Sequence, residues 1–156
     1  MIRRDGFFGS HATLLLAVFC AVSVLAATSA AEPQWLVPEG EPDATQWFAY
    51  RNSFVVSEVP DLVMAKIACD SKYWLWINGE LVIREGQLKR GPTPTSTYMD
   101  RVDLSPYLNT GSNTVALLQW YFGRHGYSHN SSGSPGLYFN LPTVELAHWK
   151  VAKHPS

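Results

Sequence analysis

The sequence has little cysteine, and this excludes a domain held together by disulfides. Only two cysteines occur among 156 residues, Cys20 and Cys69. Cys20 lies in an apolar N-terminal run, whereas Cys69 ends the β-rich run 63–69. Free cysteine is among the most frequently buried residue types, so we interpret Cys69 as a small core side chain. The fold must therefore be stable without an internal disulfide.

The sequence also lacks an excess of charge of one sign. Of 12 Lys and Arg residues and 13 Asp and Glu residues, Arg3, Arg4 and Asp5 fall within the first 31 residues, which leaves 10 basic and 12 acidic residues beyond them. No cluster of lysine or arginine forms the basic stripe that nucleic-acid binding needs. We therefore expect neither a nucleic-acid partner nor an anionic membrane surface.

No segment shows helical periodicity sustained over more than two turns. Instead, short apolar runs alternate with turns rich in glycine and proline, a pattern that favours a β-sandwich or barrel. Strands are expected at 47–54, 62–69, 72–77, 80–84, 98–102, 113–122, 137–141 and 144–151. The fold class is therefore predicted to be all-β, with two longer polar loops at 86–97 and 123–136.

The N-terminus has the order of a secretory signal peptide. Two arginines near the start precede the apolar run 13–26, and small residues follow at 27–31. The alternative is a membrane anchor, but the run is shorter than the ~20 residues that a spanning helix needs. We expect cleavage after Ala30 or Ala31, export to the periplasm or the cell exterior, and no stable membrane insertion afterwards.

Three regions follow from this assignment. Residues 1–31 form the signal peptide, and 32–46 read as an extended lead-in because they contain three prolines and several acids. Residues 47–156 form the β-sandwich, and Trp149 to Lys153 reads as a strand leading onward. This ending predicts a sandwich that is truncated at its C-terminal side.

The clearest local signal is Asn78-Gly79 between the apolar runs 72–77 and 80–84. Both residues tolerate positive φ, so we predict a two-residue type I′ hairpin. Strand alternation then places Tyr73, Leu75 and Ile77 on one face and Trp74 and Trp76 on the other. Because both faces are apolar, this strand is expected to be central in its sheet.

A short helical turn is predicted at 103–108, where Asp103 or Ser105 is able to cap it. This segment belongs to one of two patterns that resemble galactose-binding-like jelly-roll domains. The hairpin 74–82 and the turn with its following strand, 103–115, recur in that order in β-sandwich domains of glycoside hydrolases, the β-galactosidase and β-glucuronidase relatives among them.

A more specific resemblance lies in the aromatic strand 48–54 and in 120–123 together with 129–132. These segments are similar to the N-terminal region of bacterial α-L-rhamnosidase-like proteins. The resemblance implies that catalysis resides in a large helical (α/α)6 barrel further along the chain of such enzymes. No catalytic carboxylate of the family maps onto this sequence, so the chain alone is expected to lack the active site.

The resemblance and the two polar loops together predict a non-catalytic carbohydrate-binding or substrate-orienting accessory domain. Its expected partners are rhamnose-containing glycans, or another plant or bacterial polysaccharide, and the catalytic barrel domain of full-length relatives. Stacking aromatics and planar polar groups are the residue types that bind sugars. The candidates are Arg90, Tyr98, Tyr121, Arg124, His125, Tyr127 and His129.

Two alternatives remain open. In the first, the sandwich is a structural docking domain that packs on a catalytic barrel without binding sugar. In the second, it is a freestanding small lectin. An aromatic excess of six tryptophans, seven tyrosines and seven phenylalanines fits an interface as well as a sugar site.

The acids give little sign of catalysis by this chain. A glycosidase needs two carboxylates across the sugar, but Asp70, Glu80 and Asp103 lie at turns, where solvated or capping roles are usual. No cofactor is expected. A structural calcium bound through Asp100 and Asp103 is the one alternative, since calcium prefers carboxylate and carbonyl oxygens.

His125 and His129 are four residues apart, the spacing of a helical zinc pair. They lie in a loop rich in glycine and serine without a third ligand at a suitable spacing, so exposed loop histidines are the expected interpretation. Ser131 and Ser132 follow His129, and nothing in this segment indicates a strained nucleophile elbow.

Overall fold

The computed structural model describes residues 35–88, 97–127, 129–142 and 144–155. The predicted signal peptide, Cys20 and Arg90 lie outside these residues. The elements in chain order are β1 (Gln46–Val56), β2 (Met64–Cys69), β3 (Lys72–Ile77), β4 (Glu80–Gln87), β5 (Asp100–Asp103), the 3-10 helix η1 (Ser105–Tyr107), β6 (Gly111–Tyr121), β7 (Leu137–Asn140) and β8 (Lys150–Lys153).

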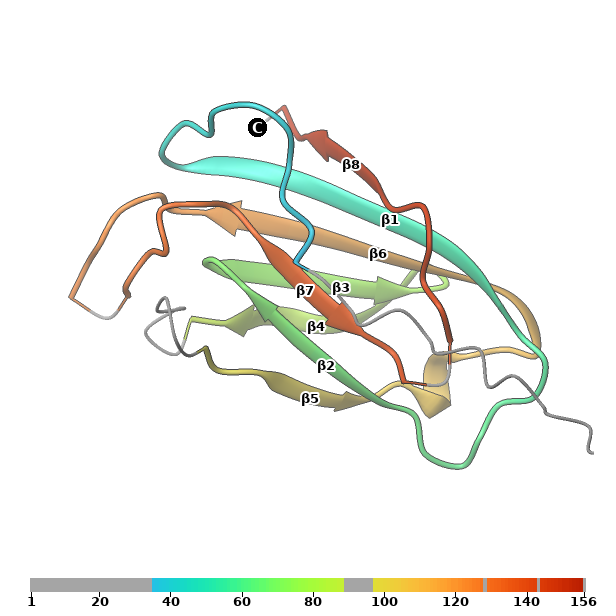
Figure 1. Cartoon of the computed structure of the whole chain (residues 1–156). Helices are drawn as coiled ribbons and strands as arrows, with labels where there is room; N and C mark the ends of the chain where they lie inside the picture. The colour runs from blue at the N-terminus through green and yellow to red at the C-terminus, as the bar shows by residue number, and fades with distance from the viewer. Residues whose placement is uncertain (1–34, 89–96, 128, 143, 156) are drawn as a thin grey trace, which may run out of the picture.

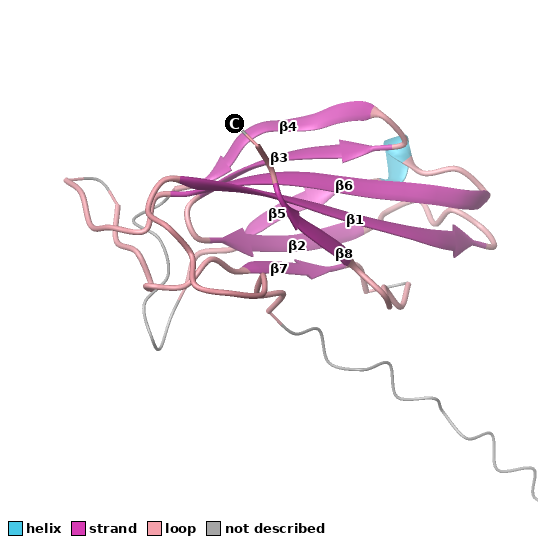
Figure 2. Cartoon of the chain, turned by 90° about the horizontal axis from the view of Figure 1, so that it is seen from above, coloured by secondary structure: helices cyan, strands magenta, loops and turns pink. Residues whose placement is uncertain are grey.

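The strands form two antiparallel sheets that face each other (Figures 1 and 2). A five-stranded sheet has the order β4-β3-β6-β1-β8, and a three-stranded sheet has the order β5-β2-β7. The predicted all-β class and the two-layered arrangement are confirmed. The predicted central position of β3 is also confirmed, because β3 lies between β4 and β6.

The core lies between the two sheets and follows from strand alternation. On β3, Tyr73, Leu75 and Ile77 are fully buried, whereas Trp74 and Trp76 are half-buried on the outer face. Each large apolar side chain buried in this way stabilises the fold by roughly 1.5–3 kcal/mol. Further inward-facing residues are Phe48, Tyr50, Phe54, Val56, Ile67, Cys69, Val115, Leu117, Tyr121, Leu137 and Phe139. Cys69 is a buried core residue, as predicted.

The hairpin between β3 and β4 has the predicted turn. Asn78 has a φ of 52° and Gly79 a φ of 87°, as a type I′ turn requires, and Ile77 pairs with Glu80. The Asn78 side chain also donates to Asn113 Oδ1 at 2.8 Å, which ties the turn to β6. The local sequence and the tertiary contacts therefore specify the same turn.

The predicted strand 144–151 is wrong over most of its length. β8 comprises Lys150–Lys153 and pairs only with Phe48–Arg51 of β1. Before β8, Leu146 and Trp149 pack on the core without strand pairing, and Ala147 accepts a hydrogen bond at 2.7 Å from the side chain of Asn52. At Ala147 the side chain of Asn52, and not the backbone of a neighbouring strand, donates this hydrogen bond. The apolar alternation of this segment therefore does not produce a strand.

The short helical turn is confirmed as η1. Asp103 Oδ1 accepts hydrogen bonds from the Ser105 N–H at 3.0 Å and from the Val63 N–H at 3.2 Å. The Ser105 bonds, the largest cause, lower the pKa of the Asp103 carboxyl. The carboxylate therefore joins this turn to the segment that leads into β2.

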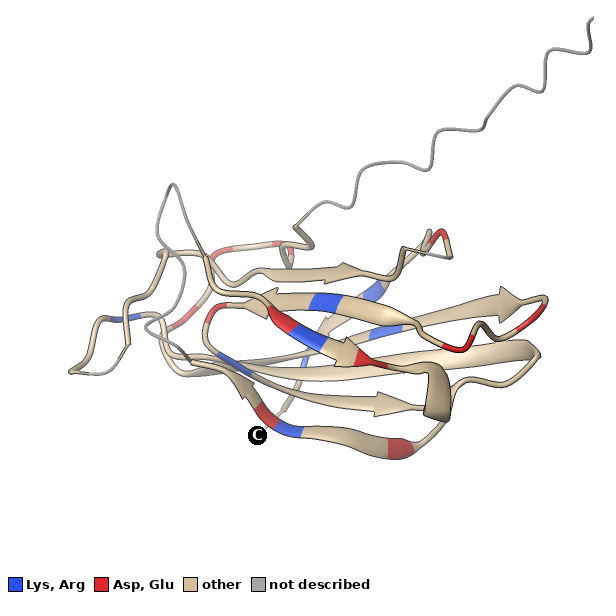
Figure 3. Ribbon diagram, turned by 90° about the horizontal axis from the view of Figure 1, so that it is seen from below, with Lys and Arg blue, Asp and Glu red and all other residues tan. Residues whose placement is uncertain are grey.

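Charged residues of both signs are interspersed along the strands and loops, and Figure 3 shows no stripe of one sign. Lys72 and Glu85, on neighbouring strands, form an ion pair at 3.2 Å. Within the described part of the chain, no helix is long and apolar enough to cross a membrane.

Candidate ligand-binding site

One end of the sandwich gathers the chain segments that carry the candidate residues. Strand pairing brings the start of β1 beside the end of β6, where Gln46 pairs with Tyr121. It also places the end of β2 beside the start of β7, where Cys69 pairs with Leu137. The loop between β6 and β7 projects from this end (Figure 1). Residues far apart in sequence therefore meet around that loop.

The loop is fastened to the sandwich by Asp70. The Oδ2 atom of Asp70 accepts hydrogen bonds from Ser131 Oγ at 2.8 Å, from the Ser132 N–H at 2.6 Å and from Ser132 Oγ at 2.9 Å. Nearer its tip the loop is closed by a hydrogen bond from the Gly126 N–H to the His129 carbonyl at 2.8 Å. A segment without regular strands is thus held in one arrangement.

Asp70 corrects an expectation from the sequence. A solvated or capping acid is predicted at this turn, but the residue is only 1 % exposed. It lies in the two-residue connection between β2 and β3, and its backbone carbonyl accepts a hydrogen bond from Gln119 Nε2. Gln119 is itself fully buried and accepts from the Tyr50 hydroxyl at 2.6 Å. Burial raises the pKa of Tyr50, so its hydroxyl remains a donor.

His129 is the second correction. An exposed loop histidine is expected, yet the residue is only 4 % exposed. Its Nε2 atom lies 2.9 Å from Ser71 Oγ and 3.3 Å from Asp70 Oδ1. Burial lowers the pKa of His129, and the neighbouring Asp70 opposes this effect. The imidazole is buried because the fastened loop folds it against the end of the sandwich.

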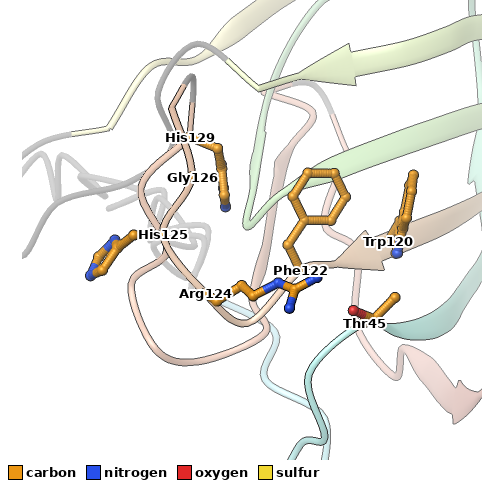
Figure 4. A pocket seen from close by; sticks show the side chains of 7 residues that line it. All are labelled: Thr45, Trp120, Phe122, Arg124, His125, Gly126 and His129. Atoms are coloured by element: carbon orange, nitrogen blue, oxygen red, sulfur yellow. The ribbon is translucent and has the colours of Figure 1, made fainter.

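A hollow of about 310 Å³ opens beside this histidine. Its described lining consists of Thr45, Trp120, Phe122, Arg124, His125, Gly126 and His129. Figure 4 shows the Phe122 ring between Trp120 and His129, with the Arg124 side chain reaching below Phe122 towards Thr45.

Aromatic rings form one continuous wall of the hollow. Phe122 lies edge-to-face with Trp120 at 4.5 Å and with His129 at 5.1 Å between ring centroids. Behind them, Trp120 stacks on Trp47 at 5.1 Å with an interplanar angle of 6°. These contacts fix the rings, because offset and edge-to-face pairs are the favoured aromatic arrangements.

Two buried nitrogen atoms in this wall have no hydrogen-bond partner within the described structure. They are Trp120 Nε1 and His129 Nδ1. Leaving a buried polar atom unpaired costs roughly 1–3 kcal/mol, and most such atoms in proteins are satisfied. Both nitrogen atoms belong to residues that line the hollow. Arg124, at the exposed rim, makes no ion pair within the described part of the chain.

The structure brings together three of the predicted site residues: Arg124, His125 and His129. Tyr127, at the tip of the same loop, is fully exposed. Tyr121 is 2 % exposed and faces the core between the sheets, away from the hollow. Tyr98 is exposed just before β5. Arg90 lies outside the described residues.

The sequence alone does not single out Trp120, Phe122 or Thr45 as site residues. Alternation along the strand 113–122 was the available signal, since it places Trp120 and Phe122 on the face opposite to Tyr121. Thr45 carries no such signal, because it reaches the hollow only through the pairing of β1 with β6.

The contacts of Ser71, His129 and Asp70 differ from those of a hydrolytic triad. In a triad, the carboxylate binds one imidazole nitrogen and the serine binds the other. Here both groups approach Nε2, and Ser71 is fully buried. The trio therefore orients the imidazole.

The two acids proposed for calcium lie at opposite ends of β5. Asp100 Oδ2 accepts from the Tyr73 hydroxyl at 3.0 Å and from the Gln87 N–H at 2.7 Å, and Asp103 holds η1. Within the described residues, no group of three or more His, Cys, Asp or Glu side chains is arranged to hold a metal ion. A calcium site stays a prediction.

Comparison with protein-family models and with curated proteins finds no match. Comparison with solved structures does. The GH78 family rhamnosidase of Bacillus sp. GL1 matches 78 % of the chain with 26 % sequence identity and a TM-score of 0.64. This sandwich is similar to part of a GH78 α-L-rhamnosidase.

Two further rhamnosidases share the fold. The native enzyme of Aspergillus terreus matches 78 % of the chain at 20 % identity, with a TM-score of 0.56. The Streptomyces avermitilis α-L-rhamnosidase, solved in complex with L-rhamnose, matches 80 % at 16 % identity, with a TM-score of 0.51. The predicted resemblance to one β-rich part of α-L-rhamnosidases is confirmed. The chain corresponds to only 13 %, 16 % and 12 % of the lengths of the Bacillus, Aspergillus and Streptomyces enzymes.

Proposed function

We propose that this domain is a non-catalytic carbohydrate-binding accessory domain of an α-L-rhamnosidase-like glycoside hydrolase, and that the hollow beside His129 holds the sugar. The observation that carries the proposal is the pairing of an aromatic wall with two buried, unpaired nitrogen atoms in that hollow. Likeness to part of a rhamnosidase supports a glycan as the ligand.

The chemistry of the lining suits a sugar ring. Trp120 and Phe122 present apolar ring surface, on which the C–H face of a sugar packs. The Nε1–H of Trp120 and the guanidinium of Arg124 donate hydrogen bonds, and the Thr45 hydroxyl both donates and accepts. No acid stands among the described lining residues, so we propose binding and orientation at this hollow, and assign no hydrolysis to it.

The ligand class that we propose is a rhamnose-containing glycan. A catalytic barrel domain is its proposed partner, since the rhamnosidases that it matches are several times longer than this chain. We also assign the sandwich to the galactose-binding-like jelly-roll type. The observed Asn78-Gly79 hairpin and the η1 turn before β6 support this assignment.

Binding is tested by titrating the domain with methyl α-L-rhamnoside and following it by calorimetry and by amide chemical shifts. We expect Arg124→Ala to weaken binding about ten- to a hundredfold, because a hydrogen bond to a charged group contributes roughly 1.5–3 kcal/mol. Phe122→Ala is expected to abolish measurable binding, since it removes the centre of the aromatic wall.

The matched control is Arg101→Ala, which removes an exposed arginine from β5 in the other sheet. This variant should bind like the unmodified domain. If Arg101→Ala and Arg124→Ala weaken binding equally, the hollow is not the site.

A second candidate function is docking, and one feature favours it. The outer face of the five-stranded sheet carries an apolar groove of about 440 Å³ where β1, β3, β6 and β8 meet. Trp76, Leu118 and Val151 are among its lining residues. If no saccharide binds and the mass in solution rises with concentration, docking through this face becomes the better assignment.

Export to the periplasm or the cell exterior is also proposed, from the basic, apolar and small-residue order of residues 1–31. Expression of the whole chain in a bacterial host should yield a product that begins near Glu32 in the exported fraction, as measured by intact mass. A cell-associated product that retains Met1 would contradict it.

A further inference from the structure

The hydrogen bonds around His129 fix which of its nitrogen atoms carries the proton. Ser71 Oγ lies 2.7 Å from Asp70 Oδ1, 2.9 Å from His129 Nε2 and 3.2 Å from the Phe122 nitrogen, whose N–H points at it. The serine has one proton and two lone pairs to satisfy these three contacts. The proton goes to the carboxylate oxygen, since that oxygen only accepts.

It follows that Ser71 Oγ accepts from both Phe122 and His129. His129 Nε2 must therefore carry a hydrogen, which also suits its 3.3 Å approach to Asp70 Oδ1. The opposite tautomer would direct an Nε2 lone pair at an acceptor oxygen. In the neutral imidazole, Nδ1 is then an acceptor, and it is the buried atom without a partner in the lining of the hollow.

The other groups of the hollow complement this acceptor. The Trp120 indole nitrogen is a donor only. His125 Nδ1 accepts a hydrogen bond at 3.3 Å from the Ser131 N–H, so the proton of the neutral His125 ring is on Nε2. A ligand in the hollow therefore needs a donor for His129 Nδ1 and an acceptor for Trp120 Nε1. A hydroxyl does both, whereas a carboxylate oxygen only accepts.

We infer that His129 is a specificity-determining residue that takes the proton of a sugar hydroxyl at Nδ1, so that the hollow selects neutral saccharides over those that carry a carboxylate. This inference rests on the proposed function. Asp70 and Ser71 are positioning residues, since they act through the imidazole. Arg124 attracts carboxylates, but it lies at the exposed rim, where water screens its charge.

The inference carries a pH dependence with a definite sign. The ionisable groups around the imidazole are Asp70 from the β2–β3 connection and Arg124 and His125 from its own loop. Burial holds the pKa of His129 below its usual value of about 6.5, and Asp70 opposes that shift. The neutral acceptor is therefore present at pH 7.5 and is lost as the pH falls through the lowered pKa. Protonated Nδ1 becomes a donor, which favours carboxylates.

The test compares methyl α-L-rhamnoside with methyl α-D-glucuronate on the unmodified domain at pH 7.5 and pH 4.5. We expect the neutral sugar to bind about tenfold more tightly at pH 7.5, the factor that one hydrogen bond is worth. The preference should shrink or reverse at pH 4.5. In protein with ¹⁵N-labelled histidine, the ring shifts of His129 at pH 7.5 should show Nε2 protonated and Nδ1 unprotonated.

His129→Gln is expected to lose the preference and its pH dependence, while His154→Gln, an exposed histidine after β8, keeps both. If His129→Gln does not fold, the ring shifts and the sugar preference of the unmodified domain still decide the matter. A protonated Nδ1 at pH 7.5, or equal or tighter binding of the glucuronate, overturns this inference and leaves the proposed function standing. Absence of binding by both sugars overturns the two together.

Discussion

Asp70→Ala is expected to lower the free energy of unfolding by about 3 kcal/mol or more and to abolish ligand binding in the hollow. The carboxylate is only 1 % exposed, and it accepts hydrogen bonds from Ser71, Ser131 and Ser132. Its removal leaves several buried donors without an acceptor, at roughly 1–3 kcal/mol each. The loop 123–136 loses its attachment to the β2–β3 connection, and His129 loses its orientation.

Urea unfolding and a saccharide titration measure the two effects separately. Asp61→Ala is the matched control, because Asp61 is exposed in the segment before β2. The urea concentration at the midpoint of unfolding should be the same for this variant as for the unmodified domain. The stability of Asp70→Asn should lie between those of Asp70→Ala and Asp61→Ala. The amide keeps the size of the side chain and one acceptor oxygen, but it places an N–H donor among the serine donors. A midpoint for Asp70→Ala within experimental error of the unmodified domain would show that Asp70 does not hold the loop.

Gly86→Ala is expected to destabilise the domain by about 3 kcal/mol without touching the hollow. A Cβ atom at Gly86 would lie 2.3 Å from Tyr73 Cζ. The tyrosine ring is fully buried, and its hydroxyl is held by Asp100 Oδ2 at 3.0 Å, so a shift of the ring away from residue 86 would break that hydrogen bond. Overpacking of a closed core costs roughly 1–3 kcal/mol, and loss of the Asp100 hydrogen bond adds to it.

Thermal and urea unfolding of Gly86→Ala are compared with those of Gly126→Ala. A Cβ at Gly126 meets no atom within 4 Å, and its φ is not in the left-handed region, so that variant should unfold like the unmodified domain. Equal stability of the two variants would mean that the Tyr73 ring is able to move away from residue 86. The packing of the Tyr73 ring of β3 against Gly86 of β4 would then be looser than the structure indicates.

Local sequence decided those parts of the fold whose partners lie close along the chain. Asn78 and Gly79 specify their turn by tolerating positive φ, and β3 specifies its two faces by alternating Tyr73, Leu75 and Ile77 with tryptophans. The same reasoning predicts a strand at 144–151 and is wrong over most of that range, because pairing with β1 reaches only Lys150–Lys153. Alternation reports which side chains are apolar, whereas strand pairing depends on a neighbour elsewhere in the chain.

The candidate site likewise combines features that nearby residues specify with contacts that only distant residues supply. The sequence identifies the loop 123–136 and three of the residues that line the hollow, because loops carry binding residues more often than strands do. It did not identify Asp70, which is separated from Ser132 by 62 residues. Nothing in the local sequence distinguishes a turn aspartate in water from one buried under a distant loop.

By itself, then, the sequence determined the all-β class, the β3–β4 hairpin and the faces of its strands, since these follow from periodicity and turn chemistry within a few residues. Only the tertiary structure decided that Trp120, Phe122 and His129 form one wall, and that Nδ1 of His129 is buried without a hydrogen-bond partner. The physical reason is that burial and hydrogen bonding depend on which atoms meet in space: the contacts that orient His129 come from Asp70 and Ser71, in the connection between β2 and β3, far from it along the chain.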